Sequence, residues 1–222
     1  MDRTMTDIAT PAALALETLP SSEGRALRLS LLILIAILVI PVGVVAVGSG
    51  AGLIALPYQM FELAARAPVI FPTHMMASGF ALLLTPAVVC ARHHPKLHRS
   101  LGRLLGVFVV IGGLTALPVA VMSHSAIAAR AGFFVQGLVW LALLIAALIA
   151  IRRRNISRHA HLMLAMIAVT SGAVWFRVMT GTAIALDLPF EPVYSVAAWV
   201  GWMIPLAIVA LMPRLVPKLL AR

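Results

Sequence analysis

Long apolar runs separated by short polar connections dominate the chain. Each run is near the length that a helix needs to cross about 30 Å of hydrocarbon. Open strands could not satisfy their backbone hydrogen bonds in lipid, so the runs are predicted to be helices. The predicted spans cover residues 27–47, 70–90, 101–122, 131–151, 161–183 and 193–212. The pattern therefore predicts an all-α fold, a polytopic bundle of six transmembrane helices.

Composition strengthens this prediction. The chain of 222 residues is 62% hydrophobic and only 11% charged, and its mean hydropathy is +1.06. These values exclude a soluble globule, because so few charged side chains cannot cover its surface. A net charge of +10 would indicate nucleic acid in a soluble protein. Here the basic residues lie in short connections between apolar runs, so the expected partner is the lipid bilayer and not nucleic acid.

The distribution of Lys and Arg predicts the orientation of the spans. All but three of the 17 basic residues fall on one side, the exceptions being Arg66, Arg130 and the intramembrane Arg177. By the positive-inside rule, the N-terminal tail of residues 1–26 and the basic C-terminal tail of residues 213–222 are both cytoplasmic. An even number of spans also places both ends of the chain on the same side of the membrane. We therefore expect a multi-pass membrane protein with both ends in the cytoplasm.

Two features near the first span affect this topology. Residues 27–47 are longer than the apolar region of a signal peptide, so we interpret them as an uncleaved span, although the small residues 48–51 leave cleavage open. Residues 51–68 form the longest outer loop, and their apolar side chains predict a short helix at the membrane interface.

The third span has a glycine pattern that is typical of close helix packing. Gly102 and Gly106 form a GxxxG motif, and Gly112 and Gly113 follow one to two turns later. This spacing predicts that another helix approaches the span closely. The sequence shows no convincing internal repeat of the kind found in many transporters.

Ionisable groups inside spans are costly and are therefore functional candidates. His74 lies about one turn into the second span, and Ser78 and Thr85 share its helix face. This polar stripe is expected to face the bundle interior. Arg177 reaches a similar level from the fifth span, which predicts an outer site with His74. The alternative for Arg177 is a structural ion pair with Asp187 or Glu191.

A second candidate site lies at the inner boundary. His159 and Arg177 share one face of the fifth span, separated by about 27 Å of helical rise. Met163, Met166 and Thr170 share this face as well. His98 opens the third span on the same side as His159, so the two histidines could meet. Two neutral imidazoles from different helices can ligate the iron of haem b, and they would be metal ligands only if haem is bound. A quinone hydrogen-bonded to the imidazoles is the other candidate ligand.

Other chemistry finds no support in the sequence. The single cysteine, Cys90, excludes an internal disulfide and a CxxC metal pair. Nucleotide-binding, zinc-protease and nucleophile-elbow motifs are lacking. No span carries two histidines three to four turns apart, as a stacked two-haem bundle requires. A lone histidine is more often a structural hydrogen-bonding group, so structural contacts remain an alternative at each position.

Several of these segments together resemble a known family. The quoted stretches are HMMASGFALL from His74 to Leu83 and PKLHRSLGR from Pro95 to Arg103, followed by His159, Met163 and Arg177. They resemble the bacterial multi-pass membrane family called domain of unknown function 2306, which implies a place in the bacterial cytoplasmic (inner) membrane. The resemblance covers about residues 70–182, with the first and last spans mostly outside it. It implies that the family's polar positions are His74, His98, Arg103, His159 and Arg177.

We therefore expect a membrane protein whose cofactor-binding residues come from His74, His98, Arg103, His159 and Arg177. The first hypothesis is a haem b- or quinone-binding component that works with a membrane redox partner. The second is a small transporter or permease for an anionic or protonatable substrate. The third is a non-catalytic scaffold or sensor, in which the histidines form hydrogen bonds between helices. The sequence assigns neither a catalytic residue nor a reaction.

Overall fold

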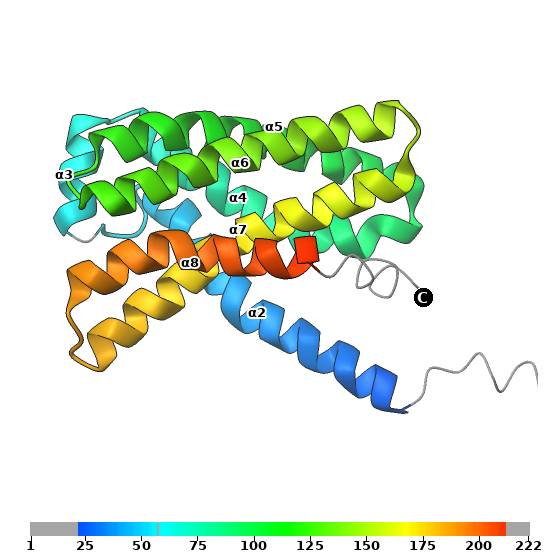
Figure 1. Ribbon diagram of the computed structural model, residues 1–222, viewed down its shortest axis with the longest axis horizontal. Helices are drawn as coiled ribbons and strands as arrows, with labels where there is room; N and C mark the ends of the chain where they lie inside the picture. The colour runs from blue at the N-terminus through cyan, green and yellow to red at the C-terminus, as the bar shows by residue number, and fades with distance from the viewer. Residues whose placement is uncertain (1–21, 57, 212–222) are drawn as a thin grey trace, which may run out of the picture. The chain divides into compact units, whose positions relative to one another are not determined.

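The computed structural model describes residues 22–56 and 58–211, and the regular elements of this part of the chain are all helices, joined by short connections (Figure 1). The elements are α2 (Ser22–Gly50), α3 (Tyr58–Arg66), α4 (Ile70–Cys90), the short 3-10 turn η1 (Ala91–His93), α5 (Pro95–Met122), α6 (Ile127–Arg152), α7 (Ile156–Ala185) and α8 (Phe190–Leu211). The chain divides into two units, Met1–Ile37 and Leu38–Arg222, and the boundary between them in the sequence falls inside α2.

The predicted helical membrane bundle is confirmed. Among the described residues, the five helices from α4 to α8 are long and apolar enough to cross a membrane. In α2, the apolar stretch found among these residues is the shorter Ala36–Gly50, so the sixth span remains a prediction. The predicted tails lie largely outside the described residues, although α2 already begins at Ser22.

The long helices extend beyond most of the predicted apolar runs. α5 begins at Pro95, a residue suited to the first helical turn because it lacks a backbone N–H. α7 begins after Asn155, whose side chain accepts a hydrogen bond from the backbone N–H of Arg158. The polar residues of the connections therefore continue the helices past the hydrocarbon, and they place His98 and His159 inside the first turns of α5 and α7.

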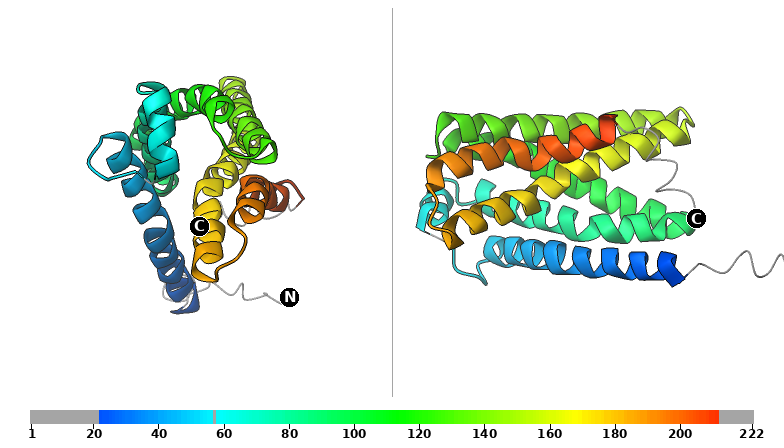
Figure 2. Two further views of the ribbon diagram at one scale, coloured as in Figure 1. Left: turned by 90° about the vertical axis from the view of Figure 1, so that its left-hand side faces the viewer. Right: turned by 60° about the horizontal axis from the view of Figure 1, so that its bottom comes forward.

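Within the second unit, consecutive helices pack side by side. α4 packs on α5, α5 on α6, α6 on α7, and α8 on both α7 and α6, while α4 touches α7 only slightly. The end-on view of Figure 2 shows this order from α4 to α8. These helices share one core of buried residues, formed by Ala81, Val88, Leu105, Val109, Trp140, Leu144, Met166, Val169 and Trp202.

The two ends of the bundle differ in charge. The α4–α5 and α6–α7 turns lie at the same end (Figure 1), and their basic side chains are exposed. At the opposite end, α3 confirms the helix predicted within residues 51–68. Leu63 and Ala64 of α3 pack with Phe71 and Met75 of α4 in a second apolar cluster. We call the two ends inner and outer, following the orientation that the basic residues predict.

The glycine prediction is half right. A Cβ atom at Gly102 would meet nothing within 4 Å, and one at Gly106 would lie 3.9 Å from Leu144, so the GxxxG motif makes no close approach. A Cβ at Gly112 would lie 2.9 Å from Ser78 Oγ, and one at Gly113 would lie 2.6 Å from Leu141. The close approach occurs further along α5, because Gly102 lies near the inner end of the helix rather than within the packed core.

Candidate functional site

His98 is anchored to the helix that precedes it. It is the fourth residue of α5, and its Nδ1 lies 3.0 Å from the carbonyl oxygen of Val88 in α4. A carbonyl oxygen can only accept a hydrogen bond, so Nδ1 carries the proton and donates. In the neutral ring this leaves the lone pair on Nε2 available. The side chain is half-buried.

His159 repeats this arrangement in the next pair of helices. It is the fourth residue of α7, and its Nδ1 lies 2.9 Å from the carbonyl oxygen of Ala147 in α6. By the same reasoning Nδ1 donates and Nε2 keeps its lone pair. The ring is also half-buried. We call His98 and His159 the inner site.

The two inner histidines lie on helix faces that lead to one core. Leu101 and Leu105 continue the face of His98, while Met163 and Met166 continue that of His159, and all four pack in the shared core. The hydrogen bond of His98 lies within the α4–α5 pair and that of His159 within the α6–α7 pair, and neither bond joins the two histidines. Among the described residues, no group of three or more His, Cys, Asp or Glu side chains could hold a metal ion.

His74 lies in a more polar environment at the outer half of the bundle. Its Nδ1 is 2.9 Å from the carbonyl oxygen of Gly112 in α5 and 3.4 Å from the hydroxyls of Ser78 and Thr115. We call these four residues the outer cluster. The predicted stripe on α4 does face the interior, because Thr85 is buried as well and donates to the carbonyl of Ala81.

Arg177 is a half-buried cation on the core-facing side of α7. Its guanidinium donates to the carbonyl oxygen of Ala173, one turn earlier in the same helix, at 2.9 Å. The predicted alternative for Arg177 was an ion pair with Asp187 or Glu191. The hydrogen bond in the structure goes to Ala173 instead, and both acidic side chains are exposed. The hydrogen bonds of Arg177 and of His74 go to backbone carbonyls of Ala173 and Gly112 and do not join the two residues, so their pairing in an outer site stays a prediction.

Arg103 is separate from both groups. Its side chain is exposed, and it lies five residues after His98, or about 140° around α5. It therefore shares neither the face nor the environment of the inner histidine. Of the five candidate residues, His98 and His159 occupy equivalent positions in two helix pairs, His74 and Arg177 each bond to a backbone carbonyl, and Arg103 lies at the surface.

Sequence reasoning missed several polar residues of the interior. Trp140 Nε1 donates to Thr170 Oγ1 at 2.9 Å, and Gln136 Nε2 donates to the carbonyl of Val169 at 3.1 Å. Thr115 was also missed. Gln136 is uncharged but is the one amide inside the predicted span 131–151, and its position in an apolar run was the signal that could have identified it.

Arg130 has a structural role that its isolation in the sequence did not reveal. Its guanidinium donates to the carbonyl oxygens of Ala120 and Val121, in the last turn of α5. These carbonyls lack partners within the helix, and the cation also complements the negative end of the helix dipole. Arg130 therefore joins the start of α6 to the end of α5.

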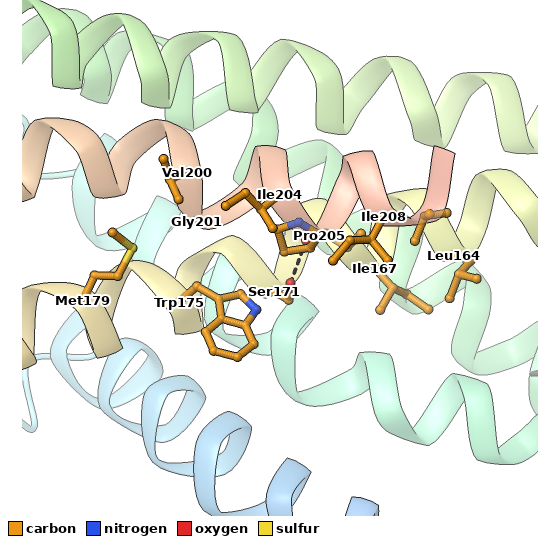
Figure 3. A pocket seen from close by; sticks show the side chains of 12 residues that line it. Leu164, Ile167, Ser171, Trp175, Met179, Val200, Gly201, Ile204, Pro205 and Ile208 are labelled. Atoms are coloured by element: carbon orange, nitrogen blue, oxygen red, sulfur yellow. Dashed lines mark hydrogen bonds between the residues drawn. The ribbon is translucent and has the colours of Figure 1, made fainter. Parts of the chain in front are cut away.

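An apolar groove of about 540 Å³ lies between α7 and α8, lined by residues such as Ile167, Trp175 and Pro205 (Figure 3). Its one hydroxyl, that of Ser171, donates to the carbonyl of Ala168 at 2.7 Å. Successive residues turn by about 100°, so Trp175 lies about 160° around α7 from Arg177. None of the five candidate site residues lines the groove.

Comparison with known proteins identifies one family. The family described as "predicted membrane protein (DUF2306)" matches residues 71–213, well over half of the chain. The match confirms the resemblance but corrects its extent, because the last span, α8, lies inside the family region and not mostly outside it. No curated protein matches the chain, and no solved structure does.

Proposed function

The chain belongs to the DUF2306 family of membrane proteins, and we propose that it is a membrane redox component that binds haem b between His98 and His159. One observation carries this proposal: two imidazoles on helix faces that lead to the same apolar core both donate Nδ1–H to a backbone carbonyl of the neighbouring helix, at 3.0 and 2.9 Å, which leaves both Nε2 atoms as lone-pair donors. Metal-ligating histidines characteristically have this second-nitrogen anchor.

The inner site fits haem b by the chemistry of its donors. Two neutral imidazoles come from different helices of one bundle, and their faces lead to the same apolar core. No fully buried side-chain nitrogen or oxygen in the described part lacks a partner, so the unbonded Nε2 atoms are not sealed inside the protein. When bound, the iron supplies one-electron transfer.

The protein's own residues fix the ligands and exclude water. Each histidine donates a hydrogen bond to a carbonyl of the preceding helix, and this bond holds the orientation of the ring. A backbone acceptor also keeps the proton on Nδ1, and thus the lone pair on Nε2. On the core side, Leu101, Leu105, Met163 and Met166 present an apolar layer next to the site.

A quinone is the alternative ligand for the same atoms. A free Nε2 lone pair can accept a hydrogen bond from the hydroxyl of a reduced quinone. Such a ligand would enter from the bilayer and would exchange electrons with a membrane redox partner. Either ligand would give the protein a redox function. Haem would be coloured and held by two imidazole ligands, whereas a quinone would be held only by hydrogen bonds.

Absorption spectra of the detergent-purified protein test the proposal. The protein is produced with a supply of haem, and spectra are recorded after oxidation and after reduction with dithionite. We expect Soret and α bands in the wild type, and the loss of these bands in His98→Ala and in His159→Ala. His93→Ala is the matched control, because His93 is exposed in the turn just before α5 and its loss should leave the bands unchanged.

The possible outcomes separate the ligands. Bands that survive both substitutions would contradict the assignment of the inner site. If the folded wild-type protein is colourless, haem b is rejected, and lipid extracts of the purified protein are then analysed for quinone by mass spectrometry. Quinone that is present in the wild type and absent in both variants would retain the redox function with the other ligand.

We also propose that the protein lies in the bacterial inner membrane with six spans and cytoplasmic ends. The exposed basic turns between α4 and α5 and between α6 and α7 support this orientation. Cysteine labelling of intact cells tests it in a Cys90→Ala background, since Cys90 is exposed. Ala126→Cys, in the outer connection, should react with an impermeant reagent, and Arg154→Cys, in an inner turn, should not. The reverse pattern would invert the topology.

A further inference from the structure

The turn between α6 and α7 contains an arginine in the left-handed backbone conformation. Arg154 has a φ of 58°. Its backbone N–H donates to the carbonyl of Ile151 at 3.0 Å. The backbone N–H of the next residue, Asn155, donates to the carbonyl of Ala150 at 2.9 Å. These two bonds form the Schellman motif that ends many helices, with Arg154 at the position that is usually glycine.

Two other helices of the described chain end in the same motif, with residues that suit it. Gly52 has a φ of 74° after α2, and Asp187 has a φ of 51° after α7. Glycine has no Cβ, and aspartate is one of the few other residues that enter this conformation readily. Arginine has neither property. The sequence therefore keeps an arginine where glycine would be more stable, which indicates that the guanidinium has a role of its own.

The neighbours of Arg154 make this turn a concentrated positive surface. We call its four exposed arginines the arginine turn: Arg152, Arg153, Arg154 and Arg158. In the unit Leu38–Arg222 the acidic residues are Glu62, Asp187 and Glu191. The first lies in α3 and the other two lie around the start of α8, at the outer end of the bundle. This unit therefore supplies no carboxylate to the arginine turn, and the compensating anion comes from outside it.

The arginine turn lies at the level of the lipid headgroups. Residues 131–151 of α6 carry no charge, and at 1.5 Å per residue they cover about 31 Å, the thickness of the hydrocarbon layer. Arg152 is the next residue. Isoleucines are exposed on both sides of the turn, with 40% of the surface of Ile151 and 70% of that of Ile156 accessible. A phospholipid offers both phosphate and acyl chains, whereas an acidic protein surface complements only the charges.

We propose that the arginine turn binds the phosphate of an anionic phospholipid. Guanidinium groups form bidentate hydrogen bonds with phosphate oxygens, and clusters of basic residues next to a membrane helix attract anionic lipids. The acyl chains of this lipid contact Ile151 and Ile156. The site does not involve the inner histidines, and its test does not depend on haem.

This role differs from the general effect of positive charge on topology. The positive-inside rule requires only that Lys or Arg lie on one side of the membrane. A headgroup site also requires the planar fork of the guanidinium, which lysine lacks. Substitution of arginine by lysine therefore separates the two roles, because the charge and the topology are kept.

Native mass spectrometry of the detergent-purified protein tests the proposal. Phosphatidylglycerol and phosphatidylcholine with identical acyl chains are added separately, and the bound lipid is measured at each concentration. We expect phosphatidylglycerol to bind at a concentration at least about fivefold lower than phosphatidylcholine, because only phosphatidylglycerol carries a net negative charge.

A pair of double variants tests the guanidinium groups. Arg153→Lys/Arg154→Lys should weaken phosphatidylglycerol binding at least about fivefold, because an ammonium cannot form the bidentate pair. Arg92→Lys/Arg99→Lys is the matched control, since both arginines are exposed at the same end, in η1 and in the first turns of α5. These two arginines do not share one tight turn, so the control should change binding by less than about twofold.

Glycine substitutions separate lipid binding from stability. Arg154→Gly should raise the midpoint of thermal unfolding in lipid-free detergent, because glycine suits a positive φ. It should also weaken phosphatidylglycerol binding about fivefold, because one cation near the headgroups is lost. Arg153→Gly removes the same charge, but Arg153 has a φ of −80°. This control should therefore weaken lipid binding by a similar factor and lower the midpoint.

Several results would overturn the proposal. These are equal binding of the two lipids by the wild type, unchanged phosphatidylglycerol binding in Arg153→Lys/Arg154→Lys, and an equal loss in Arg92→Lys/Arg99→Lys. Inorganic phosphate and polyglutamate are added as competitors of phosphatidylglycerol. Displacement of the lipid by an equal concentration of inorganic phosphate would assign the turn to a soluble phosphate, and displacement by polyglutamate to an acidic protein surface. Either result would reject the lipid.

Discussion

The inner site and the outer cluster use the same hydrogen bond in different surroundings. His98, His159 and His74 each donate Nδ1–H to a carbonyl on a neighbouring helix, at 2.9 to 3.0 Å. The helix faces of the inner histidines lead to the apolar core, whereas two hydroxyls lie 3.4 Å from Nδ1 of His74. The same anchor thus occurs in apolar and in polar surroundings, so the surroundings and not the anchor distinguish the inner site from the outer cluster.

The largest difference is expected in haem content. In His98→Ala the proposed ligand is lost, so the purified protein should contain no haem. In His74→Ala the inner site is intact, and the haem-to-protein ratio should stay within about twofold of the wild type. The pyridine haemochrome assay measures both ratios. Loss of haem in His74→Ala, with normal content in His98→Ala, would reverse the comparison.

A smaller effect is expected from filling the close approach beside the outer cluster. A Cβ at Gly112 would lie 2.9 Å from Ser78 Oγ and 3.2 Å from Trp140. Gly112→Val should therefore destabilise the protein by about 1–3 kcal/mol, the usual cost of overpacking. Chemical unfolding in detergent measures the change.

Gly102→Ala is the matched control for this substitution, because the space around Gly102 is open. Replacing a helical glycine with alanine there should stabilise the protein by up to about 1 kcal/mol. Equal losses of stability in Gly102→Ala and Gly112→Val would show that another helix packs closely on the GxxxG motif as well. The packing around Gly102 and Gly112 would then not differ.

The smallest effect concerns the cap that positions the inner histidine of α7. Asn155 accepts a hydrogen bond from the backbone N–H of Arg158, next to His159. Asn155→Ala removes this cap and should cost about 1 kcal/mol, with a shift of the haem spectrum or potential but no loss of haem. Asn155→Ser keeps a capping oxygen and should restore both readouts. If Asn155→Ala leaves the stability and the haem spectrum unchanged, the cap does not position His159.

Much of the fold could be predicted because hydrophobicity is a property of the local sequence. Runs of apolar residues gave the helices from α4 to α8 with ends that differ by a few residues from those in the structure. Helical periodicity also placed Met166 and Thr170 on the face of Arg177, and both are buried. These features need no knowledge of which helices touch.

The contacts between helices could not be predicted in this way. Nothing in the sequence indicates that His74 bonds to Gly112 or that His159 bonds to Ala147, since the acceptors are backbone carbonyls that every residue carries. The GxxxG motif was misleading for the same reason. Its spacing is a local pattern, but whether a helix lies opposite Gly102 depends on the register of distant segments.

Electron paramagnetic resonance of the oxidised, purified protein tests the central claim most directly, because it reports the axial ligands of the iron. Two anchored imidazoles predict a low-spin ferric signal, since strong nitrogen ligands on both faces favour low spin. His98→Ala and His159→Ala should each lose this signal. A high-spin signal in the wild type, a low-spin signal that survives both substitutions, or a folded protein without haem would contradict the account.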